Sequence, residues 1–243
     1  MKYHCSVLCL ALTLWAVSCR TEKAGVFGPE GIEIPAAGED SLNSAPLLLN
    51  MEQGPDFILA SYRDPALLEW VTAFFRDLCG SREIAELILS NAAEFGVSPS
   101  LAFSLSWEES RYNTRAFNRN RNNTVDRGLF QLNSASFPNL EEEDFYDPGI
   151  NTRYGIAHLR WCLDNAGTEV AALAMYNAGH HRIHSGGTPR STLDYVSRIL
   201  RRQHKIEELF LDEYIRFTEE RLNAEKRGRP SFRLSLLTPL GRR

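Results

Sequence analysis

Apolar residues recur at helical spacing through much of the chain, and the first sustained example follows residue 64. Asp64 is a good helix cap, and Pro65 suits the first helical turn. Apolar residues then fall three or four positions apart, as one buried helix face requires, at Leu67, Leu68, Val71, Phe74, Phe75 and Leu78. Gly80 follows, and glycine commonly ends helices. The pattern predicts a helix over residues 65–79.

Further helices are predicted on both sides of one irregular stretch. Ser81 and Gly96 bracket a second helix, and Ser98 with Pro99 begins a third that runs to about residue 110. Residues 111–147 lack helical spacing, so we expect loops and a small hairpin there. Helical spacing resumes over residues 149–165, 168–178, 190–204 and 206–226.

These elements predict a mainly α fold class. The helical domain is expected over residues 62–205, with the long irregular insert after its third helix. Residues 206–243 would form a C-terminal helix and a basic tail. Six cationic residues follow the last acidic one: Lys226, Arg227, Arg229, Arg233, Arg242 and Arg243. We interpret this tail as a solvated segment.

The start of the chain has the pattern of an export signal. Lys2 precedes an apolar run over residues 7–17, which is too short to span a bilayer and typical of the core of a signal peptide. Ser18 and Cys19 close the run in a way that resembles a bacterial lipobox, which implies cleavage before Cys19 and lipid attached to it. Ordinary cleavage beside a small residue is the alternative. Residues 20–61 lack a sustained period and are rich in Gly, Pro, Ser and Ala, so we interpret them as a flexible tether.

Composition narrows the classes of function. The chain has 27 Lys and Arg against 31 Asp and Glu, a net charge of −4, which argues against bulk binding of nucleic acid. Five cysteines in 243 residues are too few for a disulfide scaffold. Removal of residues 1–18 would leave Cys79 and Cys162 as a disulfide pair or as two free thiols. We expect an exported, periplasmic protein anchored to a membrane through Cys19; the oligomeric state is not predicted.

Glu109 is the strongest candidate for chemistry. It comes at the end of the third predicted helix, and helical geometry places it nearer the centre of the apolar stripe than Glu108. Partial burial raises the pKa of a carboxyl group and keeps it protonated near neutral pH. A protonated carboxyl is what a general acid for a glycosidic oxygen requires.

Three motifs, in order, resemble those of a known family. ES at residues 109–110 followed by GLFQLNS at residues 128–134 resembles the ES…GLMQ signature of the lysozyme-like superfamily. AMYNAG at residues 174–179 resembles the AYNAG motif of Slt-type lytic transglycosylases, and TLDYV at residues 192–196 resembles that family's closing T-x-x-Y-V helix. Together the motifs are far more specific than any one alone. The resemblance implies an α+β lysozyme-like fold and peptidoglycan strands as the partner.

The resemblance also implies roles for individual residues. In the family the Glu is the single acid/base, the Tyr of YNAG lines the cleft and the Gln of GLMQ binds substrate, which implies these roles for Glu109, Tyr176 and Gln131. Amides both donate and accept hydrogen bonds, as sugar hydroxyl and N-acetyl groups require, and tyrosines add a ring for stacking. We expect a substrate-binding set of Ser110, Gln131, Asn133, Tyr176, Asn177 and Tyr195. In an extended segment, Gln131 and Asn133 would face the same side.

Asp126 introduces a second mechanism. The segment before GLFQ is longer than in most Slt-type sequences and resembles that of c-type lysozymes, whose second catalytic carboxylate also comes 17 positions after the Glu. Transglycosylase chemistry would cleave the MurNAc–GlcNAc β-1,4 bond and form 1,6-anhydromuramoyl ends with Glu109 alone. Lysozyme chemistry would hydrolyse the bond with Glu109 as acid and Asp126 as second carboxylate. We favour the first because two motifs are transglycosylase-like; a non-catalytic glycan-binding module is a third hypothesis.

No metal or cofactor is predicted. His180 and His184 are four residues apart, as zinc ligands can be, and His181 lies between them. Nearby glycines indicate a loop, however, and no carboxylate lies at ligand spacing. The acidic residues 141–144 lack the spaced ligands of an EF-hand calcium site.

Overall fold

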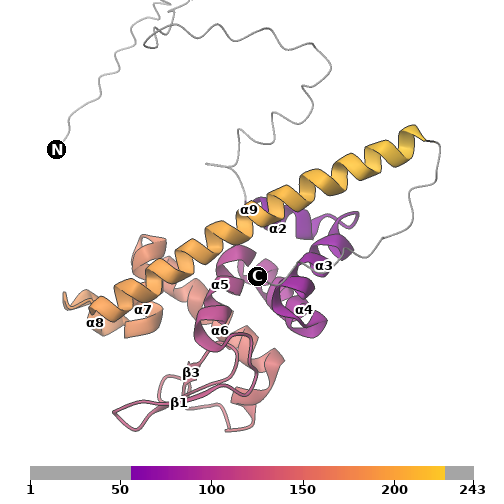
Figure 1. Cartoon of the computed structure of the whole chain (residues 1–243). Coiled ribbons are helices and arrows are strands. Elements are labelled where there is room, and N and C mark those ends of the chain that lie inside the picture. Colours follow the sequence, from indigo (N-terminus) through magenta and orange to yellow (C-terminus); the bar gives the residue numbers. More distant parts are fainter. Residues whose placement is uncertain (1–55, 228–243) are drawn as a thin grey trace, which may run out of the picture. The chain divides into compact units, whose positions relative to one another are not determined.

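The computed structural model describes residues 56–227, which lie in one compact unit of the chain. The predicted signal peptide, Cys19, most of the tether and the end of the basic tail lie outside the described residues. Figure 1 shows that helices dominate the described part and that its sheet is small. The predicted mainly α fold class is thereby confirmed.

The elements follow one another with short connections except around the sheet. In chain order they are α2 (Phe57–Arg63), α3 (Leu68–Cys79), α4 (Arg82–Phe95), α5 (Pro99–Ser110), β1 (Phe117–Arg119), β2 (Val125–Arg127), β3 (Leu132–Asn133), the 3-10 helix η1 (Asp144–Tyr146), α6 (Pro148–Ala166), α7 (Glu169–Ala178), α8 (His180–His184) and α9 (Arg190–Lys226).

Helix α4 begins and ends where the sequence predicts. The Ser81 hydroxyl accepts a hydrogen bond from the Ile84 amide at 3.3 Å, and Gly96 ends the helix in the left-handed conformation. Gly80 ends α3 in the same way, but α3 begins at Leu68, later than predicted. Asp64 ends α2 instead of capping α3, and its carboxylate accepts a hydrogen bond from the Ala66 amide at 2.8 Å. The start of α3 is therefore set by a turn between two helices.

Helix α2 corrects the predicted end of the tether. Residues 57–61 were expected to belong to the flexible segment, but they begin a helix whose Ile58 and Leu59 are buried. Phe57 contacts the rings of Phe210 and Tyr214 edge to face, with centroids 5.9 and 4.9 Å apart. Burial of these apolar side chains holds the segment on the domain.

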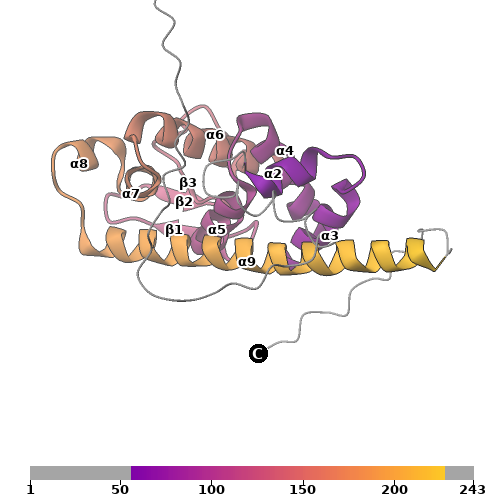
Figure 2. The same ribbon diagram turned by 90° about the horizontal axis from the view of Figure 1, so that it is seen from above.

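Helix α9 corrects a second prediction. The expected helices over residues 190–204 and 206–226 are one continuous helix of 37 residues. Its buried positions pass the predicted break at helical spacing, because Ile199, Ile206 and Phe210 share one face. Figure 2 shows α9 running along one side of the domain, beside α5 and α7.

Helix α5 is the centre of the core. Residues 99–106 are all buried, and the Phe103 ring stacks on Phe75 of α3 with centroids 4.2 Å apart. The helix ends after Ser110 because Arg111 adopts a left-handed conformation, with φ of 57°, and Tyr112 does the same, with φ of 61°. The core thus fixes the helix whose last turn carries Glu109.

The three-stranded antiparallel sheet has the order β1-β2-β3. Asp126 on β2 pairs with Asn118 on β1 and with Asn133 on β3. Gly128 turns the chain between β2 and β3 with φ of 76°, and a Cβ atom there would lie 2.3 Å from the Phe145 carbonyl oxygen. Only glycine fits this position, because the left-handed backbone and the close approach of the Phe145 carbonyl both disfavour a side chain.

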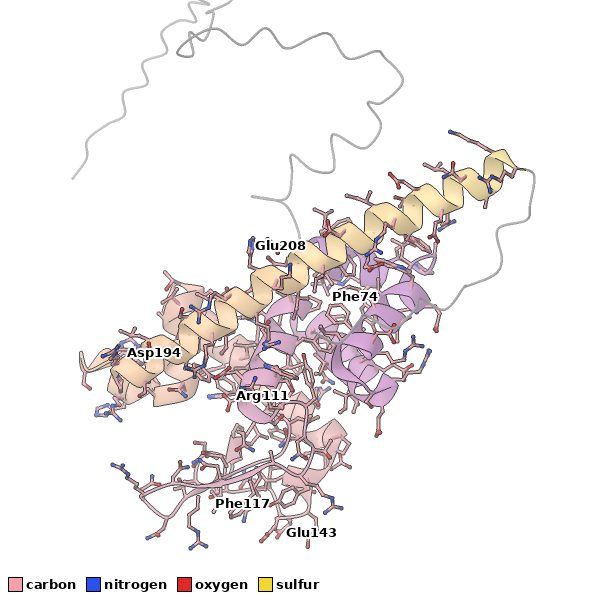
Figure 3. All side chains as sticks on the ribbon, in the orientation of Figure 1. Phe74, Arg111, Phe117, Glu143, Asp194 and Glu208 are labelled. Carbon is pink, nitrogen blue, oxygen red and sulfur yellow. The ribbon has the colours of Figure 1, made fainter. Side chains whose placement is uncertain are left out.

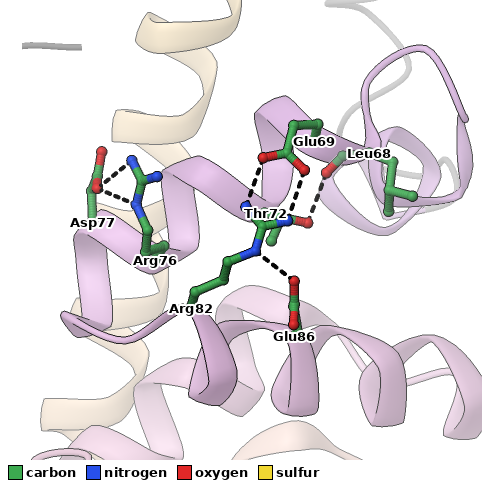
Figure 4. A network of polar contacts seen from close by, with 7 residues as sticks. All are labelled: Leu68, Glu69, Thr72, Arg76, Asp77, Arg82 and Glu86. Atoms are coloured by element: carbon green, nitrogen blue, oxygen red, sulfur yellow. Dashed lines mark hydrogen bonds and ion pairs between the residues drawn. The ribbon is translucent and has the colours of Figure 1, made fainter. Parts of the chain in front are cut away.

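An ion-pair network joins α3 to α4 on the surface (Figure 4). Arg82 binds both carboxylate oxygens of Glu69, at 2.7 and 2.8 Å, and also binds Glu86 at 2.7 Å. All three side chains are about half exposed, so water screens their attraction and their contribution to stability is small. Between residues 56 and 227, no helix has the length and apolar character needed to cross a bilayer.

Candidate active site

A cleft of about 710 Å³ lies where the end of α5, the sheet and helices α6 to α8 meet. In the view of Figure 3, Arg111, which directly follows α5, lies below α9 and above Phe117 of β1. Six of the eight predicted site residues line the cleft: Glu109, Asp126, Gln131, Asn133, Tyr176 and Asn177. Ser110 and Tyr195 do not line it.

Glu109 carries the most perturbed carboxyl group of the cleft. Its burial raises the pKa of the carboxyl from 4.5 to about 8. A hydrogen bond donated by the Tyr195 hydroxyl opposes this shift, whereas the negative charges of Asp126 and Glu108 add to it. Glu109 is therefore protonated at neutral pH, as a general acid must be.

Glu108 has a different environment although it is the adjacent residue. Its carboxylate binds the Arg198 guanidinium of α9 at 2.7 Å and does not line the cleft. The ion pair directs Glu108 towards α9. The helical-face argument that preferred Glu109 to Glu108 thus agrees with the geometry.

Asp126 lines the same cleft from the sheet. Its carboxylate accepts hydrogen bonds from the side-chain amides of Asn133 at 2.6 Å, Asn120 at 2.8 Å and Asn118 at 3.3 Å. These donors satisfy the carboxylate without a cationic partner. The two cleft carboxyl groups therefore have contrasting surroundings, with Glu109 desolvated and Asp126 bound by amides.

Gln131 and Asn133 both line the cleft, but by a different geometry from the one predicted. Strand β3 begins only at Leu132, and Gln131 has a left-handed backbone with φ of 46°. The Gln131 amide donates to the Gly128 carbonyl oxygen at 3.1 Å. Asn133 donates to Asp126, as well as to the Thr124 hydroxyl at 2.9 Å. A tight turn, and not strand alternation, brings Gln131 to the cleft.

The YNAG segment lies at the cleft through α7. The Tyr176 hydroxyl donates to the Phe130 carbonyl oxygen at 2.9 Å, which ties α7 to the GLFQ turn. The Asn177 side-chain oxygen accepts a hydrogen bond from the Thr192 hydroxyl of α9 at 2.8 Å. Both side chains are therefore fixed by protein contacts while they line the cleft.

Two predicted substrate-binding residues need correction. The buried Ser110 hydroxyl donates to the Leu129 carbonyl oxygen at 2.7 Å and so links α5 to the GLFQ turn. Tyr195 is only 6% exposed, which leaves no ring face for sugar stacking; its hydroxyl instead donates to Glu109. Neither residue lines the cleft: Ser110 ties α5 to the turn, and Tyr195 binds the acid.

Sequence reasoning missed the aromatic side of the cleft. Phe137, His158, Trp161 and His180 line it together with Tyr176. Burial lowers the pKa of His158, which is therefore neutral at neutral pH. The signal that could have found two of these residues is the spacing of His158 and Trp161 on α6, since residues three apart share a helix face.

The histidine segment forms the short helix α8, where a loop was predicted. The rings of His180 and His184 are 4.2 Å apart between centroids. Among residues 56–227, no group of three or more His, Cys, Asp or Glu side chains is gathered as a metal site would need. Cys79 and Cys162 are free thiols, so the disulfide alternative does not apply.

A helical domain with a small antiparallel sheet and an acidic residue in the cleft between them defines a lysozyme-like fold. The family model described as "Transglycosylase SLT domain" matches residues 86–194. The SLT family belongs to the lysozyme-like superfamily, and the predicted resemblance to it is confirmed over these residues. An SLT domain indicates a peptidoglycan-cleaving function of the lytic transglycosylase type and binding to glycan strands.

Two similar curated proteins are both named "X polypeptide", one from Escherichia coli and one from Escherichia coli strain K12. Each is 27% identical to this chain over 143 residues, an alignment that covers 55% of this chain and 82% of the relative. That name states no activity, so the mechanism has to be argued from the cleft.

Proposed function

We propose that this protein is a lytic transglycosylase that cleaves the MurNAc–GlcNAc β-1,4 bond of peptidoglycan and leaves 1,6-anhydromuramoyl ends. The observation that carries the proposal is the Glu109 carboxyl, which lines the cleft with a pKa of about 8. The SLT match over residues 86–194 supports the reaction class.

The proposed reaction uses Glu109 twice. The protonated carboxyl donates its proton to the glycosidic oxygen as the bond to C1 of MurNAc breaks. The resulting carboxylate then accepts the proton of the C6 hydroxyl, whose oxygen attacks C1 and closes the anhydro ring. The proton balance closes without water, and Glu109 returns to its acid form. The Tyr195 hydroxyl holds the carboxyl in one orientation throughout.

Hydrolysis remains the second candidate, because one observation favours it. Asp126 lines the same cleft and is held by amides, while Glu109 is desolvated. A desolvated acid beside a solvated carboxylate is the pair that retaining glycoside hydrolases use. In that reaction Asp126 would be nucleophile or charge stabiliser, and water would complete the step.

Product mass distinguishes the two candidates. Digestion of purified peptidoglycan strands by the wild-type protein should release muropeptides lighter by one water than hydrolysed ones. Asp126→Asn should retain this anhydro product, since the proposed reaction has no step on Asp126. Release of reducing MurNAc alone, lost in Asp126→Asn, would instead establish the hydrolase.

The third candidate, a glycan-binding module without catalysis, predicts no product from any variant. Strand binding and strand cleavage should therefore be measured on the same preparation. The proposed enzyme gives both for the wild type and binding alone for Glu109→Gln. Binding without cleavage in the wild type would support the module.

We also propose that the protein is exported to the periplasm and anchored through Cys19. The support is the apolar run over residues 7–17 followed by Ser18 and Cys19. Mass spectrometry of the membrane fraction should find a mature N-terminus at Cys19 carrying lipid. A Cys19→Ala protein should be released from the membrane fraction, and equal membrane association of this variant would contradict the anchor.

A further inference from the structure

The two sides of the cleft differ in chemistry. The side formed by the sheet and its loops presents polar groups, including Asn120, Asn122 and Asn133. The other side, formed largely by α6, α7 and α8, presents aromatic rings, including His158, Trp161 and His180. A pyranose ring has the same division, because hydroxyl and acetamido groups project from its edge while its C–H groups form an apolar face. Amides suit the edge and aromatic rings suit the face.

Trp161 is an exposed ring on the aromatic side. Its side chain is 44% exposed although it is large and apolar, so it leaves indole surface open at the cleft. The His158 ring stacks against it at an interplanar angle of 10° with centroids 5.8 Å apart, and His180 contacts it at 5.4 Å. The indole is therefore held in place from two sides before any ligand binds.

The rings continue as a row along α6. Tyr154, His158 and Trp161 fall four and three residues apart, so they share one face over about 10 Å of helix axis. Tyr154 is also 42% exposed, and Phe137 packs edge to face against both Tyr154 and His158, with centroids 5.8 Å away in each case. Exposed aromatic side chains that line up beside a cleft mark a binding surface and not a core.

We infer that Trp161, supported by His158 and His180, forms an additional saccharide-binding surface that holds a β-1,4-linked strand of N-acetylated hexosamines by ring stacking. The inference rests on the proposed function, because it assigns this surface to the same glycan strand. The surface holds the sugar face while the amides opposite hold its edge. It does not touch the reacting bond, so it adds affinity for long strands without changing the chemistry at Glu109.

Affinity in a catalytically inactive background tests the inference. The β-1,4-linked hexamer of N-acetylglucosamine should be titrated against Glu109→Gln and against Glu109→Gln with Trp161→Ala, by calorimetry. Loss of one aromatic contact should weaken hexamer binding by about tenfold. Indole fluorescence should respond to the hexamer in the first protein and lose most of that response in the second.

Two further variants serve as controls. Trp161→Phe keeps an aromatic face and should retain most of the affinity, and it also covers the case in which Trp161→Ala fails to fold. Phe117→Ala removes an aromatic side chain that is 55% exposed but does not line the cleft, and it should bind the hexamer normally. In the active background, Trp161→Ala should raise KM for long strands and leave kcat close to the wild-type value.

The outcomes separate this inference from the proposed function. Equal hexamer affinity with and without Trp161, or no measurable binding to either protein, would overturn the inference. A protein that binds the hexamer through Trp161 but releases no anhydro product from strands would contradict only the proposed transglycosylase.

Discussion

The end of α5 and the neighbouring sheet each place one carboxyl group in the same cleft, but they treat it in opposite ways. Glu109 lies in the last turn of α5, whose residues 99–106 are all buried, and loss of water raises the pKa of Glu109 to about 8. Asp126 lies in the middle of a three-stranded sheet, where side-chain amides from β3, β1 and the loop after β1 bind its oxygens. Environment, more than residue type, distinguishes these two carboxyl groups.

Substitution of Glu109 should have the largest effect on strand cleavage, and its neighbour Glu108 provides the matched control. Glu109→Gln removes the transferable proton and should lower strand cleavage at least about 100-fold. Glu108→Gln removes only the partner of Arg198 and should leave the cleavage rate nearly unchanged. Release of muropeptides from purified strands measures both. Similar losses in the two variants would show that the acid has been assigned to the wrong residue.

The pH dependence of the free energy of unfolding should report the burial of Glu109 independently of activity. A carboxyl whose folded pKa is raised from 4.5 to about 8 stabilises the fold fully below pH 4.5, and this contribution is lost as the pH rises towards 8. The wild type should therefore lose stability relative to Glu109→Gln over this window, by on the order of 1 kcal/mol per pH unit. Urea unfolding at a series of pH values measures the difference. A constant difference from pH 4.5 to 8 would contradict the raised pKa.

Tyr195 offers a finer test of the acid. Its hydrogen bond lowers the pKa of Glu109, so Tyr195→Phe should raise that pKa further. The alkaline limb of kcat/KM, where Glu109 loses its proton, should move to higher pH. A structural role in packing alone would reduce activity without moving this limb. Recovery of a wild-type profile is not expected from any residue lacking the hydroxyl.

Substitution of Asp126 should give the smallest shift in the pKa of Glu109, in the direction opposite to that of Tyr195→Phe. Its negative charge contributes to the raised pKa of Glu109, less than burial does. Asp126→Asn should therefore move the alkaline limb to lower pH while keeping the amide contacts partly satisfied. Shifts of the alkaline limb in opposite directions for Tyr195→Phe and Asp126→Asn would support the contrasting effects of the two side chains on the pKa of Glu109. Shifts in the same direction would contradict them.

Helix caps, helix faces and short motifs in the sequence correctly predicted those features that depend on neighbouring residues in the chain. Ser81 and Gly96 define α4 because capping depends on neighbouring residues. The helical-face argument favoured Glu109 because burial follows from the face that a residue occupies. The motifs identified the GLFQ turn and YNAG helix, which meet through the Tyr176 hydrogen bond.

Tertiary contacts decided what the sequence could not predict. Helix α2 is held by Phe57 and Ile58 against α9 and the core, which are far away in the chain. The role of Tyr195 depends on where α9 meets α5, and no spacing rule relates residues 86 positions apart. The stacking of Trp161 on His158 and His180 likewise depends on how α8 folds back on α6.

Helix α9 extends well beyond the residues that match the SLT family, so the matched segment and the folded domain have different bounds. The family match ends at residue 194, one residue before Tyr195, whose hydroxyl binds the acid. Further along the same helix, Phe210 packs against Trp70 and Phe74, which precede the matched segment. The residues matched by the family are therefore a shorter stretch than the one that packs into a common core. A fragment limited to residues 86–194 would keep Glu109 and the YNAG segment, but it would lack Tyr195 and the rest of α9, which help to bury and orient the acid.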